Sequence, residues 1–298
     1  MTCERLHTVV TGASSGIGRA TALRLAAAGQ HVFAGVRREA DGGSLRSAAA
    51  AVHGRGGPGD GEITPLMLDV TDSGQVTAAA AAVSAHTARL DGLVNNAGVG
   101  LACPAELLPL DAFRRLTEIN VTGQLAVTQA FLPLLRQAQG RIVVIGTIGV
   151  RFGPPFAGAL DATKAALTAL ADALRQELAP WRIRVVVIEP ASIASSAAEK
   201  VSRDAAAVMA AAPAKGRALY ADAFGRTLAV MERRETGGSS PDVAAAAVAR
   251  ALTVARPRSV YLCGRFARRL SLLSRLPTPV GDAARRRVFG LPAPGSLA

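Results

Sequence analysis

A glycine-rich turn near the N-terminus has the residue types and the spacing that bind a phosphate group. It follows a short apolar run, residues 7–11, opens a helical stretch, residues 19–28, and reads Thr11-Gly12-Ala13-Ser14-Ser15-Gly16-Ile17-Gly18. Gly12 permits a tight turn, Gly16 lets the backbone approach a pyrophosphate, and Gly18 lets the helix pack on the strand. Strand, glycine spacing and helix together predict a dinucleotide site and disfavour a plain Gly-Ser loop.

The end of the next apolar run, residues 31–36, indicates which dinucleotide is bound. Folds that prefer NAD usually place an acidic residue there, about 20 residues after the turn, where it binds the ribose hydroxyls. Val36 holds that place, and Arg37 and Arg38 follow it. Two guanidinium groups attract a 2′-phosphate, which favours NADP (NADPH). The alternative is that both arginines are surface charges.

These residues need a fold that brings the ends of several strands together. Apolar runs alternate with helical stretches, and the expected strands cover residues 7–11, 31–36, 63–69, 93–95, 141–147, 184–189 and 259–262. Strands that are apolar throughout indicate a parallel sheet covered on both faces, and right-handed crossovers make it doubly wound. We predict an α/β fold with a Rossmann sheet of about seven strands. Residues 42–61 are expected to form a weak helix and a loose loop.

The chain shows no linker before residue 265. We therefore predict a single domain over residues 1–265, with residues 191–240 inserted after the sixth strand as a substrate lid. Residues 266–298 are expected to form a basic C-terminal tail, because nine arginines and one acid lie between Arg256 and Ala298.

Residues 5 to 265 resemble the short-chain dehydrogenase/reductase superfamily, because several motifs occur in order. They are the glycine turn, Asp69, Asn95-Asn96-Ala97-Gly98, Asn120, Lys164 and Pro190. The resemblance implies that Asp69 contacts the adenine. It also implies the residues along the cofactor, which are Asn95, Ala97, Gly98, Lys164, Pro190, Ile193 and Ser195. At the turn after Pro190, Ala191 stands where the family usually has glycine.

The same resemblance has two further implications. The segment after residue 255 is similar to the steroid- and retinol-dehydrogenase-like branch, which implies a bulky apolar small-molecule substrate. The superfamily also implies a homodimer or homotetramer through the helices that hold Asn120 and Lys164.

One member of the family's catalytic tetrad is missing. The family uses asparagine, serine, tyrosine and lysine, and Asn120, Thr147 and Lys164 occupy three of these positions. Leu160, four residues before Lys164, stands where the tyrosine should give a proton to the substrate carbonyl. Neither Tyr220 nor Tyr261 precedes a lysine by four, and Asp161 is turned by about 100° along the helix. A positioned general acid contributes about 10²–10⁴ in rate, so ketone reduction should be slow.

Three interpretations stay open. In the first, the protein is an NADP-dependent oxidoreductase acting on a hydride acceptor, such as an iminium, enone or quinone, that needs no tyrosine acid. In the second, the fold serves a non-redox reaction, a cyclisation, isomerisation or elimination, with Thr147, Asn120 and Tyr220 lining the pocket. In the third, it is a non-catalytic cofactor-binding protein whose basic tail docks a partner.

Charge and composition limit the partners. The net charge is +12, and the tail attracts an anionic surface, although no segment resembles a nucleic-acid module, so we expect no nucleic acid. A solvated surface is the simpler interpretation, with peripheral membrane contact of the tail as the alternative. No apolar run of about 18 residues predicts a transmembrane helix, and no signal peptide is seen.

The remaining metal-ligand residue types show no pattern. The three cysteines, Cys3, Cys103 and Cys263, lie far apart and match no metal or CxxC spacing, which favours a reducing, cytoplasmic setting without a metal site. The four histidines are expected to be structural or exposed and to form no cluster. They are His7, His31, His53 and His86.

Overall fold

The computed structural model describes residues 5–53 and 61–296. Seven parallel strands form one sheet in the order β3-β2-β1-β4-β5-β6-β7. They are β1 (His7–Val10), β2 (His31–Val36), β3 (Glu62–Met67), β4 (Gly92–Asn95), β5 (Arg141–Ile145), β6 (Arg184–Pro190) and β7 (Val260–Cys263). The predicted doubly wound sheet is confirmed, and the strand order reverses between β1 and β4, where such folds bind ligands.

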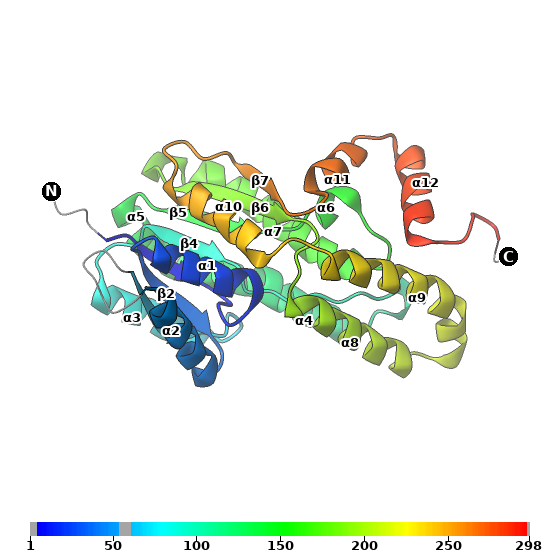
Figure 1. Cartoon of the computed structure of the whole chain (residues 1–298), viewed down its shortest axis with the longest axis horizontal. Helices are drawn as coiled ribbons and strands as arrows, with labels where there is room; N and C mark the ends of the chain where they lie inside the picture. Colours follow the sequence, from blue (N-terminus) through cyan, green and yellow to red (C-terminus); the bar gives the residue numbers. More distant parts are fainter. Residues whose placement is uncertain (1–4, 54–60, 297–298) are drawn as a thin grey trace.

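Helices cover both faces of the sheet (Figure 1). One face carries α1 (Gly16–Ala27), α2 (Glu39–His53) and α10 (Pro241–Thr253), and the other carries α3 (Ser73–His86), α5 (Gly123–Ala138) and α7 (Gly158–Glu177). Strand β2 shows why both faces are apolar: Val32 and Ala34 pack under the first set, and Phe33 packs under the second. Alternate residues of a strand point to opposite faces, so both sides of each strand must be buried.

Short elements link the sheet to the ligand edge. They are η1 (Ala105–Leu107), α4 (Leu110–Thr117), the π-helical turn η2 (Glu118–Thr122), α6 (Gly149–Phe152) and η3 (Ala179–Trp181). After β6, the chain forms α8 (Ser196–Ala211) and α9 (Ala214–Thr236), which lie side by side and project beyond the sheet (Figure 1). Ala205 and Met209 of α8 pack against Phe224 of α9.

The basic C-terminal segment is helical and packed. It forms α11 (Ala267–Leu273) and α12 (Thr278–Phe289). Leu270 and Phe289 are buried with Ile148 and Phe152, which belong to the loop and short helix after β5. No helix in the described part of the chain is both long and apolar enough to cross a membrane.

The region expected to be a weak helix and a loose loop is partly regular. Helix α2 begins at Glu39 and runs through the first glycines to His53, whereas residues 54–60 lie outside the described residues. Glu39 and Asp41 in its first turn suit the positive end of the helix dipole. A Cβ at Gly42 would lie 2.8 Å from Pro65 Cβ, so this glycine serves close packing on β3.

Candidate cofactor and active site

The glycine turn is fixed by close packing against the end of β4. Gly12 and Gly16 have positive φ angles of 64° and 53°, which favour glycine. A Cβ at Gly12 would lie 2.8 Å from Ala97 Cα, and one at Gly18 would overlap the Gly12 carbonyl oxygen and the Asn96 amide nitrogen. Close contacts therefore require glycine at positions 12 and 18, and the positive φ angle favours glycine at position 16.

Thr11 ties the turn to the Asn95-Asn96-Ala97-Gly98 segment. Its hydroxyl oxygen accepts hydrogen bonds from the backbone nitrogens of Asn96 (3.0 Å) and Ala97 (2.9 Å). The Asn96 side chain in turn donates to the carbonyl oxygens of Thr11 (2.9 Å) and Gly12 (3.1 Å). Sequence reasoning did not assign roles to Thr11 and Asn96, although both lie inside the motifs.

The start of α1 can accept a negatively charged group. Ser14 and Ser15 are exposed, and Ser15, at the N-cap, makes no side-chain capping hydrogen bond. The first turn, beginning at Gly16 and Ile17, contains no acidic residue. The backbone N–H groups at this helix start thus face outward without a competing carboxylate, which suits a phosphate.

Charged side chains at the ends of β2 and β3 surround the expected adenosine end of the cofactor. Arg37 and Arg38 are both exposed, but Arg38 is held by Asp41 through two hydrogen bonds of 2.9 and 2.8 Å. Partial burial alone would raise the pKa of Asp69, but hydrogen bonds from Thr71 and the charges of Arg37 and Arg115 leave it lowered. Asp69 is therefore an anionic acceptor, and Arg37 is the better placed of the two arginines to meet a phosphate.

The segment along the expected cofactor path is anchored from α5. The Asn95 side chain donates to Thr128 Oγ1 at 2.8 Å, and Gln124 Nε2 donates to the Ala97 carbonyl oxygen. A Cβ at Gly98 would lie 3.1 Å from Asn120 Oδ1 and 3.4 Å from Lys164 Nζ. Gly98 thus brings the backbone against two residues of the expected tetrad.

Asn120 lies in the π-helical turn η2 and is fully buried. Its Oδ1 accepts from Val99 N at 2.9 Å, and its Nδ2 donates to Val99 O at 2.8 Å and to Thr163 Oγ1 at 2.9 Å. Because these bonds use both ends of the amide, Asn120 holds the Val99 loop against α7 and acts here as a positioning residue.

Lys164 and Thr147 both lie near the end of β5. Lys164 is buried in α7, and its Nζ donates to the Ile145 carbonyl oxygen at 2.7 Å. Burial lowers the pKa of Lys164 to about 8, so the ammonium is still mostly charged at pH 7. Thr147 Oγ1 accepts from Gly149 N at 3.1 Å, which leaves its hydroxyl hydrogen able to donate to a ligand.

Leu160 gives the tyrosine position an apolar surface. It lies in the first turn of α7 and is partly buried. A Cβ at Gly100 would lie 3.4 Å from Leu160 Cδ2 and 3.0 Å from Val201 Cγ2 of α8. The position where the tyrosine is expected is therefore bordered by an aliphatic side chain and by the helix that begins the expected lid.

Asp161 contacts a different segment from Leu160. A Cβ at Gly149 would overlap Asp161 Oδ1, so the carboxyl group lies against the loop that follows Thr147. Burial raises the pKa of Asp161 to about 7, and its Oδ2 is buried without a hydrogen-bond partner among the described residues. This carboxylic acid could not be singled out from the sequence, because its burial depends on how α6 packs on α7.

The turn after β6 contacts both the loop that carries Thr147 and the glycine turn. The Pro190 carbonyl oxygen accepts from Ile148 N at 3.1 Å, which links this turn to the loop carrying Thr147. Ile193 is buried and pairs with Ser239, which lies just before α10. Ser195 lies over the glycine turn, since a Cβ at Gly16 would be 3.6 Å from Ser195 Cβ. Segments distant in the sequence thus lie together around the glycine turn.

The proposed lid region also carries Tyr220. Its hydroxyl donates to Glu106 Oε2 at 2.7 Å, and its ring meets that of Phe156 edge-on. Tyr220 therefore links α9 to the η1 segment. The other tyrosine, Tyr261, lies in β7, where its hydroxyl accepts from Arg258 N at 3.2 Å.

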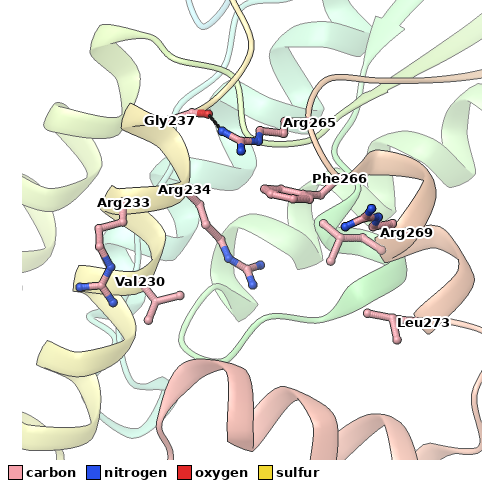
Figure 2. A pocket seen from close by; sticks show the side chains of 9 residues that line it. Val230, Arg233, Arg234, Gly237, Arg265, Phe266, Arg269 and Leu273 are labelled. Atoms are coloured by element: carbon pink, nitrogen blue, oxygen red, sulfur yellow. Dashed lines mark hydrogen bonds between the residues drawn. The ribbon is translucent and has the colours of Figure 1, made fainter.

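A basic cavity of about 430 Å³ lies between α9 and α11 (Figure 2). Its lining includes four arginines, Arg233, Arg234, Arg265 and Arg269, and none of the described lining residues is acidic. Arg265 donates to the Gly237 carbonyl oxygen at 2.8 Å. Part of the tail's positive charge thus faces this cavity, whose remaining lining includes Phe266, Leu270 and Leu273.

The expectation that the histidines form no cluster is wrong. His7, His31 and His86 come together, and one ring nitrogen of each lies within 4.8 Å of the others. The parallel register pairs His7 with His31, and the end of α3 brings in His86. The side chain of His53 lies outside the described residues.

Comparison with known proteins agrees with this geometry. A sequence profile of the family described as short chain dehydrogenase matches residues 6–206. Human retinol dehydrogenase 5 is 33% identical over 293 residues, covering 95% of this chain and 89% of that protein. The 11-beta-hydroxysteroid dehydrogenase type 2 of Oryctolagus cuniculus is 32% identical over 265 residues, covering 86% of this chain and 63% of that protein.

Two solved structures carry different nicotinamide cofactors. A short chain dehydrogenase from Burkholderia cenocepacia in complex with NADP is 26% identical with a TM-score of 0.67, covering 97% of this chain and 99% of that one. A short chain dehydrogenase/reductase from Burkholderia phymatum in complex with NAD has a TM-score of 0.77 over 96% and 97% of the two chains. The second is 21% identical and shows the fold alone.

Proposed function

The chain belongs to the short-chain dehydrogenase/reductase superfamily, on its steroid- and retinol-dehydrogenase-like branch, and from this premise we propose an NADP-dependent oxidoreductase. Its substrate is an apolar small molecule that accepts hydride without a tyrosine acid. The observation that carries the proposal is an aliphatic residue, Leu160, where the acid is expected, together with a tightly packed glycine turn that would hold a dinucleotide.

The residues of the cradle fit a dinucleotide. The glycine turn leaves the start of α1 without a carboxylate, Asp69 is available to the adenine, and Gly98 keeps the backbone close to Asn120 and Lys164. The bound nicotinamide would supply hydride. Lys164 would bind the ribose hydroxyls, and Ser195 and Ile193 would lie over the nicotinamide end.

The residues expected to contact the substrate favour a hydride acceptor that needs no proton from a protein side chain. An iminium is already cationic, and an enone or a quinone can take its proton from water after hydride has added. The Thr147 hydroxyl is the donor that this chain offers to a developing negative charge. Leu160 and Val201 would border the apolar body of the substrate.

The preference for NADP rests on Arg37. Arg38 is engaged by Asp41, whereas Arg37 is exposed and close enough to Asp69 to lower its pKa. A guanidinium is suited to bind a 2′-phosphate through paired hydrogen bonds. The homo-oligomeric state and the cytoplasmic location stay predictions.

The test begins with cofactor binding. Purified protein is titrated with NADPH and with NADH while the fluorescence of the reduced nicotinamide is followed. We expect NADPH to bind at least tenfold more tightly than NADH. Failure of both to bind would contradict the proposal and favour a cofactor-independent role.

Turnover is then measured as NADPH oxidation with iminium, enone and quinone acceptors, and with matched ketones as the control. We expect consumption of NADPH with at least one acceptor class and little with ketones. A productive reaction in which NADPH stays unoxidised would instead indicate the non-redox alternative.

A further inference from the structure

Three histidines gather at the amino-end edge of the sheet, on the side opposite the cofactor cleft. His7 is the first residue of β1, His31 is the first residue of β2, and His86 is the last residue of α3. The ring centroids are 5.6 Å apart for His7 and His31, 6.0 Å for His7 and His86, and 4.4 Å for His31 and His86. The imidazole rings of three elements that are distant in the sequence thus lie close together.

We propose that His7, His31 and His86 form a binding site for a divalent transition-metal ion, with Zn²⁺ as the best fit. Imidazole nitrogens are preferred ligands of Zn²⁺, which binds them at about 2.0–2.1 Å in tetrahedral geometry. Ligand nitrogens in such a site are about 3.3 Å apart, from that bond length and angle. The nitrogens here lie within 4.8 Å of one another, and exposed His86 at a helix end can move to close the difference.

Neighbouring residues already orient the buried ring. His31 Nε2 is hydrogen-bonded to Thr64 Oγ1 at 2.8 Å, which leaves Nδ1 for a metal. A hydrogen bond to the far nitrogen of a ligating histidine is the usual way in which proteins fix its tautomer. Phe33 stacks on the same ring with centroids 4.4 Å apart.

A second ring offers a nitrogen that the protein leaves unused. His7 Nδ1 is buried and has no hydrogen-bond partner among the described residues. Burying such a nitrogen without a partner is unfavourable, and a metal ion would satisfy it. Glu62 is a candidate fourth ligand, since its Oε2 lies 3.8 Å from His31 Nδ1.

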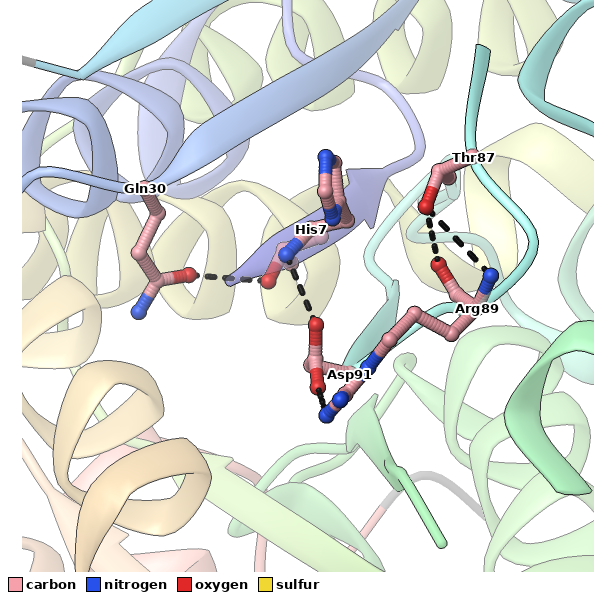
Figure 3. Close-up of polar contacts among 6 residues, drawn as sticks. His7, Gln30, Thr87, Arg89 and Asp91 are labelled. Carbon is pink, nitrogen blue, oxygen red and sulfur yellow. Dashed lines mark hydrogen bonds and ion pairs between the residues drawn. The ribbon is translucent and has the colours of Figure 1, made fainter. Parts of the chain in front are cut away.

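The surrounding charges do not repel a cation strongly. Arg89 pairs with Asp91 at 2.6 Å, and the same Asp91 accepts from the His7 backbone nitrogen at 2.9 Å (Figure 3). Arg5 lies 3.7 Å from Glu62. Each arginine near the cluster is therefore matched by a carboxylate, and the three imidazoles bring no charge of their own when neutral.

The site would be structural. The ion would join β1, β2 and α3 at the edge of the sheet that does not face the cofactor, so it should stabilise the fold without changing NADPH affinity. A ligand that binds only the folded state raises Tm, and the rise continues with the logarithm of its concentration above Kd. The inference does not depend on the proposed enzyme activity.

The experiment uses the full chain without a polyhistidine tag, stripped of metal by a chelator. Zn²⁺ is titrated calorimetrically, and Co²⁺ is added separately to record its visible absorption. The His86→Gln variant removes the exposed ligand, and Ser84→Ala, on the same exposed part of α3, is the matched control. Far-UV circular dichroism and NADPH affinity establish that each variant is folded.

We expect one Zn²⁺ per chain, a Co²⁺ spectrum typical of four-coordinate geometry, and a higher Tm with Zn²⁺. His86→Gln should weaken Zn²⁺ binding at least tenfold, and Ser84→Ala should leave it unchanged. If His86→Gln fails to fold, His7→Gln provides the same comparison. The proposal is overturned if no stoichiometric binding occurs, or if the histidine variant binds Zn²⁺ as tightly as the parent.

Discussion

The expected cofactor region and the expected substrate region of the site are held by different kinds of contact. Around Gly12 and Gly18, the motif is maintained by backbone contacts and by the hydrogen bonds of Thr11 and Asn96, so that few other residues fit. Around Gly100, the side chains of Leu160 and Val201 border the space with aliphatic groups. The chain thus keeps close contacts around its glycine turn although an aliphatic residue stands where a proton donor is expected.

The largest effect should come from Gly18→Ala. The added Cβ would overlap the Gly12 carbonyl oxygen and the Asn96 side chain, so the turn would have to move. We expect NADPH affinity to fall by about 100-fold or more, or the chain to unfold. The control is Gly43→Ala, where a Cβ meets nothing within 4 Å and the helix should gain about 0.5–1 kcal/mol. Equal NADPH binding by both variants would contradict the role given to the turn.

The second prediction restores the missing acid. Leu160→Tyr places a phenol four residues before Lys164, and a positioned general acid contributes about 10²–10⁴ in rate. We expect ketone turnover with NADPH to rise by a factor in that range. Leu160→Phe supplies the ring without the hydroxyl and should leave ketone turnover low. The same rate in both variants would mean that the phenol does not reach the reacting atoms.

The third prediction separates the two arginines at the end of β2. Arg37→Ala should weaken NADPH binding about tenfold and leave NADH binding nearly unchanged, because only NADPH carries the 2′-phosphate. Arg38→Ala should have a smaller effect, since Asp41 already holds that guanidinium. Fluorescence titration of both variants with both cofactors measures the four affinities. A larger loss in Arg38→Ala would reverse the assignment.

The last prediction concerns stability and not cofactor binding, and it rests on the buried carboxyl group of Asp161. Burial raises the pKa of this carboxyl group in the folded state to about 7. The contribution of the neutral carboxyl group to the free energy of unfolding is therefore fully present below the unfolded pKa and is lost as pH rises through 7. Asp161→Asn should therefore raise stability more at pH 8 than at pH 5, by about 2 kcal/mol. Denaturant unfolding at the two pH values measures this difference, and the same gain in stability at both pH values would contradict it.

The sequence predicted the architecture because short apolar runs indicate the strands and the stretches between them indicate the helices. Apolar runs gave all seven strands to within a few residues, and the crossover rules gave the parallel sheet. The helix over residues 39–53 was underestimated, because Gly42 was taken as a loop signal although it packs on Pro65. Glycine spacing alone does not distinguish a turn from a close contact between two elements.

The features that escaped prediction depend on contacts between distant parts of the chain. His7 and His31 meet only because β1 and β2 pair in one register, and His86 reaches them only from the end of α3. Asp161 is buried because α6 covers it. The basic tail of residues 266–298 is predicted from its charge alone, and its two helices, with Phe289 buried beside Phe152, depend on contacts with distant segments.

The packing of α12 also shows which residues support the loop that carries Thr147. Arg285 donates to the Phe152 carbonyl oxygen at 2.9 Å, and Phe289 packs beside Ile148, next to Thr147. The family profile stops at residue 206 and already contains all four positions of the tetrad. A fragment cut at that boundary would keep every one of these residues and lose the support behind the loop that carries Thr147.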